Sequence, residues 1–367
     1  MNVRHRLMII IAVACGLLPL IACAAEPAPS TGAGATRARA TSPPAGPPAG
    51  ELIYVANADS GPVTAYSAGS LGSAAPVREV LAPSDLNAVW DPWGVTSDAT
   101  GNIYVQSFLS DATTAVFPPG VHGTAAPLRK FMGISPDNRG IAVDSNGYAY
   151  VAGGDQPTVV AVEPPGASGA GKDLYYVPPV RTIHLDEQWN PWPSDLAVNS
   201  SNELLAVTAR QQGNAVEVFA GGPNGGSTPV RVISGPRTGL GSCGTVCDLV
   251  VAFSPLTGQI YVAVSDGAAT RISAFAGNAK GDARPVRTIE GPATGLAGTS
   301  VTGLAVSPCD GTVYAMVHAS SSAFGPAAID AYGRSAGGDI RMLRSFTDSR
   351  SRFRSAEGLT VTGCPSR

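Results

Sequence analysis

All four tryptophans of the chain lie in two nearly identical strings, Trp90-Asp91-Pro92-Trp93 and Trp189-Asn190-Pro191-Trp192. Exposed indole rings can stack on sugar faces, peptide side chains or flat apolar ligands, while neighbouring carboxylates and amides fix the orientation of the ligand. The alternative is structural: each string folds back as a plug, the proline stiffens the turn and the indoles cover a junction between elements. The two strings are therefore candidates for a binding surface or for a packed cap.

Composition and motifs exclude several other kinds of chemistry. Only 14% of the residues are charged and the formal net charge is −3, so the chain lacks a basic field that would collect nucleic acid. The sequence contains no Ser-His-Asp string, no nucleotide-binding glycine loop and no HExxH motif, which leaves hydrolase and nucleotide-dependent activities without support. We expect no nucleic-acid partner.

A repeat of about fifty residues must position these side chains. Four short strings, rich in β-branched and aromatic residues and bounded by turn residues, recur six times in a fixed order, which predicts four-stranded antiparallel units. Such units are typical of propeller blades, which cannot bury their faces alone and stack around an axis. The first strings begin at Gly94, Gly140, Asp195, Val250, Gly303 and Gly358, the second at Leu52, Asn102, Tyr148, Leu204, Gln259 and Thr312, and the third lie around Thr64, Ala115, Val160, Val216, Ile272 and Ile329.

The fourth string reads Pro-Val-Arg or Pro-Leu-Arg in five units and, more loosely, Asp339-Ile340-Arg341 in the last. An arginine that recurs in every outer strand indicates a structural position, either a charge that protects the sheet edge or an ion pair to the next blade. We likewise expect Asp144 and its equivalents to be hairpin residues rather than calcium ligands. The five arginines are Arg78, Arg129, Arg181, Arg231 and Arg287.

The copies also determine how the ring closes. The first unit begins at its second string, Leu52, and the last unit is followed by an additional first string, Gly358 to Thr362. The C-terminal strand must therefore complete the first blade, which removes an open sheet edge. The sequence predicts an all-β, six-bladed propeller that is closed by its C-terminal strand.

Four cysteines lie in the repeat region, beyond residue 50. Cys309 and Cys364 each lie six residues after the start of a first string, and the closure makes these two strands neighbours, so we predict a disulfide between them. Cys243 and Cys247 lie in one glycine-containing loop and are predicted to pair locally. A metal site built from the four is less well supported, because no CxxC or Cys/His spacing is present.

In a propeller, the mouth of the central pore is built from the loops that enter each first strand and leave each second strand, and ligands usually bind there. Both tryptophan strings lie in loops that enter first strands, in blades two and four, and the entry positions of blades three and four are Arg139 and Asp195. The predicted ligand-binding residues are Trp90, Trp93, Trp189, Trp192, Arg139 and Asp195.

The string Gly140-Ile-Ala-Val-Asp144, followed by a turn and Tyr148-Ala-Tyr-Val151, resembles the NHL-repeat propellers and the wider group of gluconolactonase-like and streptogramin-lyase-like proteins. The resemblance covers residues 51–364 and implies the fold, but these propellers serve as enzymes, sensors and binding scaffolds. Gluconolactonase-like enzymes hold a divalent metal at the pore. By residue type, the resemblance implies Glu357, Asn138 and Asp195 or Asp248 as ligands of Ca²⁺ or another divalent metal, and a lyase-like activity would use His318.

The first fifty residues predict export and an anchor. Arg4-His5-Arg6 precede an apolar stretch, Leu7 to Ala22, of signal-peptide length, and Leu20-Ile21-Ala22-Cys23 resembles the bacterial lipobox, in which the cysteine becomes the lipidated first residue. Cleavage after Ala25 and an uncleaved anchor are the alternatives. We predict a lipoprotein signal peptide at 1–22, a disordered Ala/Pro/Gly-rich tether at 23–50 and the propeller at 51–367.

The function predicted from these features is binding rather than catalysis. We expect a monomeric lipoprotein, lipid-anchored on the extracytoplasmic side of the cell membrane, whose tryptophan-bearing face engages an envelope carbohydrate, peptide or protein without a cofactor. The first alternative is a metal-dependent lactonase- or lyase-like enzyme with its site at the pore, and the second is a purely structural protein. Convergence of Glu357, Asp195, Asp248 and Asn138 on one point in the pore would favour the enzyme.

Overall fold

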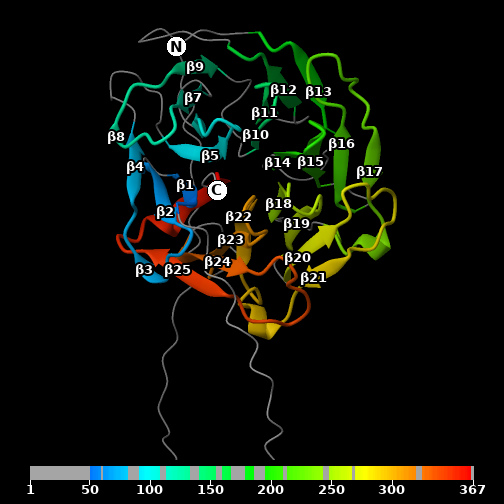
Figure 1. Cartoon of the computed structure of the whole chain (residues 1–367). Helices are drawn as coiled ribbons and strands as arrows, with labels where there is room; N and C mark the ends of the chain where they lie inside the picture. Colours follow the sequence, from blue (N-terminus) through cyan, green and yellow to red (C-terminus); the bar gives the residue numbers. More distant parts are fainter. Residues whose placement is uncertain are drawn as a thin grey trace, which may run out of the picture. The chain divides into compact units, whose positions relative to one another are not determined.

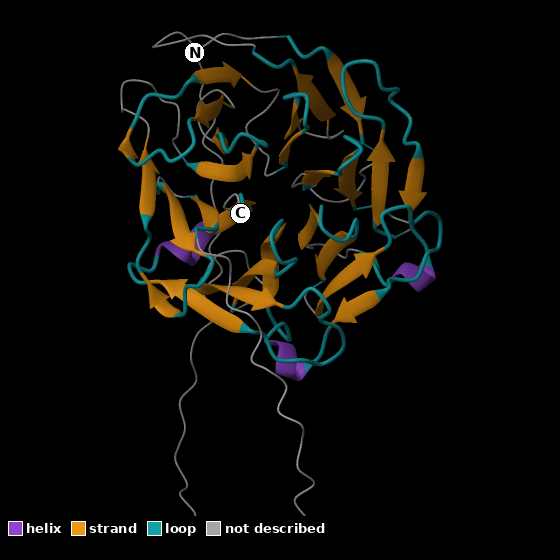
Figure 2. Cartoon of the chain, viewed as in Figure 1, coloured by secondary structure: helices purple, strands orange, loops and turns teal. Residues whose placement is uncertain are grey.

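The computed structural model describes residues 50–58, 61–81, 91–107, 113–132, 140–153, 159–166, 178–185, 195–209, 213–242, 248–266, 269–319 and 325–364. Six antiparallel sheets surround a central axis, which confirms the all-β, six-bladed propeller (Figures 1 and 2). The helices of the described part are three 3-10 turns, η2 (Pro236–Thr238), η3 (Pro292–Thr294) and η4 (Arg352–Ser355). None of these described helices has the length and apolar character needed to cross a membrane.

In each blade the first strand lies nearest the axis and the fourth lies outermost. Blade 1 consists of β26 (Ala356–Thr362), β1 (Leu52–Asn57), β2 (Val63–Ser67) and β4 (Arg78–Leu81); blade 2 of β5 (Pro92–Ser97), β6 (Ile103–Ser107), β7 (Thr113–Phe117) and β9 (Arg129–Met132); blade 3 of β10 (Ile141–Val143), β11 (Ala149–Gly153), β12 (Val159–Glu163) and β13 (Arg181–His184). Blade 4 consists of β14 (Leu196–Val198), β15 (Leu204–Thr208), β16 (Ala215–Phe219) and β17 (Arg231–Ile233); blade 5 of β18 (Asp248–Phe253), β19 (Ile260–Ser265), β20 (Thr270–Phe275) and β21 (Arg287–Ile289); blade 6 of β22 (Ser300–Val306), β23 (Val313–His318), β24 (Ala327–Tyr332) and β25 (Arg344–Asp348).

The propeller has two faces, which we name by their loops. The mouth face is the one on which each first strand begins, and the turn face is the opposite one, which carries the turn between the first and second strands.

The core lies between the blades, in six clusters that each join two neighbouring sheets. Because both faces of a blade are covered, every residue of β6 and β7 is buried. Each large apolar side chain buried in this way stabilises the fold by about 1.5–3 kcal/mol.

The ring closes as predicted. β26 pairs antiparallel with β1, with Tyr54 opposite Thr360, so the two ends of the described chain share one sheet. Cys309 and Cys364, which directly follow β22 and β26, form a disulfide with a Cα–Cα distance of 5.3 Å. The closure and the predicted bridge between blades 6 and 1 are therefore confirmed. The second predicted pair, Cys243 and Cys247, lies outside the described residues.

In four of the six described sheets, those of blades 1, 4, 5 and 6, the outer edge is covered by backbone from the following blade. β8 (Gly123–Thr124), from the long connection of blade 2, pairs parallel with β4 of blade 1. β3 (Gly72–Ala74), from blade 1, pairs in the same way with β25 of blade 6. Single bridges from Gly281 to Ile233 and from Gly338 to Ile289 repeat the arrangement at blades 4 and 5. These contacts satisfy backbone groups that an open edge would expose.

The repeated arginines are structural, as predicted, but their partners differ from the prediction. Arg78, Arg129 and Arg287 donate to the hydroxyls of Tyr54, Tyr104 and Tyr261 in the second strand of their own blade, at 3.3, 2.6 and 3.0 Å. In blades 1, 4, 5 and 6 backbone pairing protects the edge, so these blades require no edge charge. Contacts to the next blade go to carbonyl oxygens, such as that of Arg334 for Arg287, rather than to carboxylates.

In blade 6 the fourth strand lies later in the sequence than predicted. The sequence placed this strand at Ile340-Arg341, but β25 begins at Arg344. The Leu343 N–H donates to the carbonyl oxygen of Ala331 at 2.7 Å, just as the Val286 N–H of blade 5 donates to Ala274. Met342 therefore stands where other blades have proline. Without the proline, the sequence pattern did not indicate the strand.

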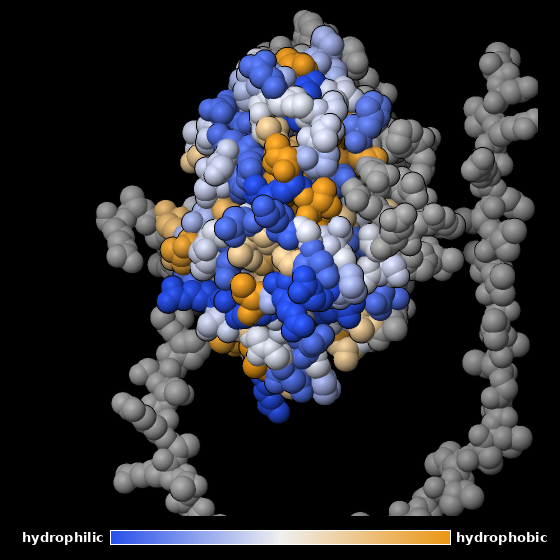
Figure 3. Space-filling view, turned by 90° about the vertical axis from the view of Figure 1, so that its right-hand side faces the viewer, coloured by the Kyte–Doolittle hydropathy of each residue, from blue (hydrophilic) through white to orange (hydrophobic). Residues whose placement is uncertain are grey.

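One exposed aliphatic side chain recurs at the start of the fourth strand in every blade. Its recurrence indicates a position defined by the repeat rather than a patch specific to one blade. Figure 3 agrees, because on the side in view the hydrophobic residues form small groups separated by hydrophilic ones. The six residues are Val77, Leu128, Val180, Val230, Val286 and Leu343, between 41% and 57% exposed.

Turns between first and second strands are held by a polar side chain at their first position. The Asp144 carboxylate accepts the backbone N–H groups of Asn146 and Tyr148 at 2.9 and 3.0 Å, and Asn199 does the same for Ser201 and Glu203 at 2.9 Å. This confirms Asp144 as a hairpin residue.

Candidate functional site

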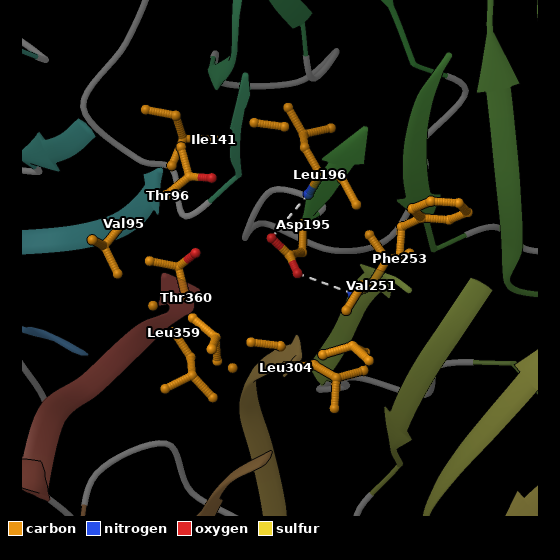
Figure 4. Close-up of a pocket in the computed structure, with 18 of the residues that line it drawn as sticks. Val95, Thr96, Ile141, Asp195, Leu196, Val251, Phe253, Leu304, Leu359 and Thr360 are labelled. Atoms are coloured by element: carbon orange, nitrogen blue, oxygen red, sulfur yellow. Dashed lines mark hydrogen bonds between the residues drawn. The ribbon is translucent and has the colours of Figure 1, made fainter. Parts of the chain in front are cut away.

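The first strands of all six blades converge on a central channel with a cavity volume of about 240 Å³. Most of its described lining is aliphatic, and Figure 4 shows Val95, Ile141, Leu196, Val251, Leu304 and Leu359 around it. Two carboxylates, Asp195 and Glu357, line the same channel, and the described lining includes no Lys, Arg or His. Aliphatic side chains and polar groups thus share the channel wall, with the two carboxylates at the start of the strands.

Glycines at the start of the first strands allow neighbouring blades to approach closely. A Cβ on Gly358 would lie 2.7 Å from the Trp93 carbonyl oxygen and 2.9 Å from the Val95 nitrogen in blade 2. A Cβ on Gly303 would lie 2.9 Å from the Cβ of Leu359 in blade 1. A side chain at this position therefore points at the next blade, which explains why glycine recurs there.

Asp195 occupies the glycine position in blade 4, where the gap accommodates its carboxylate. One oxygen accepts the backbone N–H of Leu196 and the other accepts the backbone N–H of Val251 in blade 5, both at 2.9 Å (Figure 4). The carboxylate, which is partly exposed to the channel, thus links two blades. Charge-assisted hydrogen bonds of this kind are stronger than neutral ones.

Asp248 makes an equivalent connection between blades 5 and 6. The Ser300 hydroxyl donates to the Asp248 carboxylate, and the Val301 N–H donates to the Ser265 hydroxyl at 3.0 Å. Asp248 is 8% exposed and is not part of the described channel lining. Of the implied metal ligands, the structure therefore brings Asp195 and Glu357 to the channel and leaves Asp248 beside it. Within the described ranges, no three His, Cys, Asp or Glu side chains are grouped closely enough to hold a metal ion.

His318 belongs to the junction between blades 6 and 1. It is fully buried, and its Nε2 lies 3.1 Å from both the Thr302 hydroxyl and the Ala356 carbonyl oxygen. The Thr302 hydroxyl also donates to Ala356 at 2.8 Å. This placement corrects the expectation of a histidine available at the mouth, because burial and neighbouring backbone separate His318 from the channel.

Three β-bulges occur immediately before the repeated glycines. The strand registers skip one residue at Trp93, Thr302 and Glu357, in blades 2, 6 and 1. A bulge leaves one residue without an opposite partner and turns its side chain away from the regular alternation. Sequence reasoning missed these bulges, and the glycine that follows each of them is the signal that could have indicated them.

The tryptophan strings are described only in part. Trp93 is 7% exposed, so its indole has no open face for stacking, which corrects the expectation of an exposed ring and matches the plug alternative. The preceding Asp91 has φ 64°, in the left-handed region that few non-glycine residues adopt. Other predicted residues lie outside the described ranges: Trp90, Trp189, Trp192, Asn138, Arg139 and the lipidation candidate Cys23.

Comparison with known proteins gives the fold. No protein-family model matches the sequence. No curated protein matches it. Among solved structures, a protein of unknown function from Bacteroides caccae is similar with a TM-score of 0.54 and 12% identity, over 86% of this chain and 99% of that chain. A chain of the nidogen/laminin complex is similar with a TM-score of 0.55 and 14% identity, over 86% of this chain and all 100% of that chain. With its six sheets and these neighbours, the chain belongs to the six-bladed β-propellers, and the finer NHL-repeat assignment stays a prediction.

Proposed function

We propose that the chain is an exported, lipid-anchored binding propeller, which presents its mouth face to a carbohydrate, peptide or protein of the cell envelope. The observation that carries the proposal is that the described polar side chains at the mouth form hydrogen bonds between neighbouring blades. Asp195, Asp248 and Thr302 each bind backbone or hydroxyl groups of the next blade. Such a ring is a rigid platform for the loops above it, and rigid scaffolds with variable loops are typical of binding domains.

The fold is compatible with a protein partner, since one similar chain belongs to the nidogen/laminin complex. Two carboxylates reach the channel from its described lining, with no Lys, Arg or His beside them in that lining. These two, Asp195 and Glu357, keep the metal-dependent lactonase- or lyase-like enzyme as the second candidate. Among the residues implied for such a metal, they are the pair that share the channel.

The binding experiment compares the purified chain with a Trp90→Ala/Trp189→Ala variant on arrays of envelope glycans and envelope proteins. We expect a ligand whose binding falls at least tenfold in the variant. A Val77→Ala variant, on the outer strand of blade 1, is the matched control and should bind normally. If the chain binds stoichiometric Ca²⁺ or another divalent metal, and Glu357→Ala removes it, the enzyme candidate replaces the binding propeller.

The anchor is tested separately. We expect Cys23→Ser to release the chain from the membrane fraction and to abolish metabolic labelling with palmitate, because the lipidated thiol is absent. Cys15→Ser changes a cysteine inside the apolar stretch and should leave both unchanged. Membrane attachment that survives Cys23→Ser would favour the uncleaved anchor.

A further inference from the structure

A second groove lies on the turn face, on the opposite side of the propeller from the mouth face. Its cavity volume is about 330 Å³, and it separates blades 3 and 4. Asn146 and Tyr148 line it from a blade 3 turn, Ser201 and Asn202 from the equivalent turn of blade 4, and residues 221–224 from the connection that follows β16. We name it the blade 3–4 groove.

Blade 3 differs from blades 4 and 5 in one residue that lines this groove. At the position of Tyr148, blades 4 and 5 carry Glu203 and Gln259, which bind Arg231 and Arg287 of their own outer strands. Tyr148 has neither a carboxylate nor a carboxamide at this position. The Tyr148 ring is instead half-buried beside the groove. Departures from an otherwise regular repeat are where functional sites are expected.

Arg181, the corresponding arginine of blade 3, crosses to the next blade and holds one wall of the groove. Its guanidinium donates to the carbonyl oxygens of Ala220, Gly222 and Gly226 at 2.6, 3.0 and 2.5 Å, and Arg181 is only 8% exposed. The Tyr150 hydroxyl accepts the Gly222 N–H at 2.6 Å. Four hydrogen bonds thus fix the connection 220–226 before any ligand arrives, which lowers the entropy cost of binding.

The floor of the groove is equally constrained. Asn202 has φ 60°, and its amide exchanges two hydrogen bonds with Ser145 of blade 3, at 3.0 and 2.8 Å. A Cβ on Gly221 would lie 1.7 Å from the Asn202 carbonyl oxygen, so the connection packs directly on the turn. Only glycine permits this contact. The two blades therefore hold the groove in one arrangement.

The described lining is polar and uncharged. Asn146 and Asn224 are exposed and supply carboxamides, each with two N–H donors and one acceptor oxygen. Ser201 adds a hydroxyl, and Tyr148 adds an aromatic surface. A charged ligand would find no counter-ion in this lining, and an apolar side chain would find no hydrophobic pocket. Paired donors and acceptors beside an aromatic ring match a pyranose ring, with hydroxyls at its edge and C–H groups on its face.

We propose that the blade 3–4 groove binds a neutral saccharide. The carboxamides of Asn146 and Asn224 bind sugar hydroxyls, and the Tyr148 ring packs against the sugar face. This site is independent of the mouth face, so it stands whether or not the tryptophan strings bind a ligand.

The test titrates the purified full-length chain with maltohexaose, cellohexaose, chitohexaose and linear mannan by isothermal calorimetry. We expect one of these neutral glycans to bind, and Tyr148→Ala and Asn224→Ala each to weaken that binding at least tenfold. Asn278→Ala is the matched control, because Asn278 is an exposed asparagine on the equivalent connection of blade 5. It should bind like the unmodified chain.

A second measurement separates lost binding from lost folding. Asn224→Ala and Asn278→Ala should melt like the unmodified chain, because both side chains are exposed. Tyr148→Ala, whose side chain packs in part against the core between blades 3 and 4, should still be folded at the temperature of the titration and unfold in one cooperative transition. The proposal is overturned if no neutral glycan binds to a chain that melts normally, or if Tyr148→Ala and Asn224→Ala leave glycan binding unchanged. A peptide or an anionic glycan that binds in place of the neutral ones, and is lost in these variants, would also overturn it.

Discussion

The Asp195 carboxylate of blade 4 accepts the backbone N–H of Val251 in blade 5 at 2.9 Å. This bond satisfies a backbone donor next to the channel with a side chain from another sheet. It also shows why an acidic residue can replace glycine at this one point of the repeat. An acidic residue in a propeller mouth therefore need not be catalytic, because the junction between blades itself requires an acceptor.

Replacing Asp195 with alanine should reduce the free energy of unfolding by about 1–3 kcal/mol, because the N–H groups of Leu196 and Val251 lose their acceptor. Asp195→Asn retains one acceptor oxygen and should cost less. Urea denaturation measures both. A variant that unfolds normally but no longer binds the mouth-face ligand would assign the carboxylate to binding instead.

The contact between blades 1 and 2 gives a steric prediction. Gly358→Ala places a Cβ within 3 Å of the Trp93 oxygen and the Val95 nitrogen, both backbone atoms, so one sheet must shift. We expect a loss of about 1–3 kcal/mol in urea denaturation. Gly226→Ala is the control, because its Cβ meets only the Thr228 nitrogen, at 3.9 Å. Its stability should stay within about 0.5 kcal/mol. Equal losses in the two variants would show that the blades are not in close contact at Gly358.

The sequence predicted the architecture well because a propeller repeats one unit. Six copies of each string gave the blades, and the displaced copies at Leu52 and Gly358 gave the closure. The Cys309–Cys364 bridge was predicted because each cysteine lies at the same distance from the start of its first string, and the closure makes these two strands neighbours. Each of these inferences used the spacing of residues along the chain, which a repeat converts directly into position.

The site was less predictable, because it depends on contacts that spacing does not encode. The bulges at Trp93 and Glu357 change side-chain direction by insertion of one residue. The burial of His318 and Trp93 depends on the adjacent blade rather than on their own strand. Arg181 binds carbonyl oxygens of the next blade, as Arg231 and Arg287 also do. Blade 3 differs in having Tyr148 where blades 4 and 5 have the side-chain acceptors Glu203 and Gln259, a difference that the arginine pattern alone did not indicate.

Removing the disulfide should weaken the closure. The bridge spans 55 residues of chain and joins the ends of β22 and β26. A Cys309→Ser/Cys364→Ser variant should lose about 2–4 kcal/mol in the free energy of unfolding, because the unfolded chain regains the entropy of the open loop. Reductant should lower the melting temperature of the unmodified chain more than that of the variant, which retains only the predicted local pair Cys243 and Cys247. An unchanged unfolding free energy would mean that β26–β1 pairing alone holds the ring.

Glu51, the residue before β1, couples the same closure to pH. It is 1% exposed, and the Ser307 hydroxyl donates to its Oε1 at 2.6 Å. Its second oxygen is buried, and none of the described residues donates a hydrogen bond to it. Burial is the main cause that raises the pKa of the Glu51 carboxyl from 4.5 to about 7, and nearby Arg344 only partly opposes this effect. The folded propeller therefore favours the protonated acid.

Folding raises the pKa of the Glu51 carboxyl, so the protonated carboxyl contributes to the free energy of unfolding fully below about pH 4.5. This contribution is lost as the pH rises to about 7, where the carboxyl also ionises in the folded chain. Glu51→Gln keeps an acceptor for Ser307 and cannot ionise. Relative to the unmodified chain, it should gain about 3 kcal/mol in the free energy of unfolding between pH 4.5 and pH 8. Urea denaturation of both chains at these two pH values measures the change, and other titrating groups cancel in the comparison. If the difference in the free energy of unfolding between the two chains is the same at both pH values, Glu51 ionises in the folded propeller as it does in water.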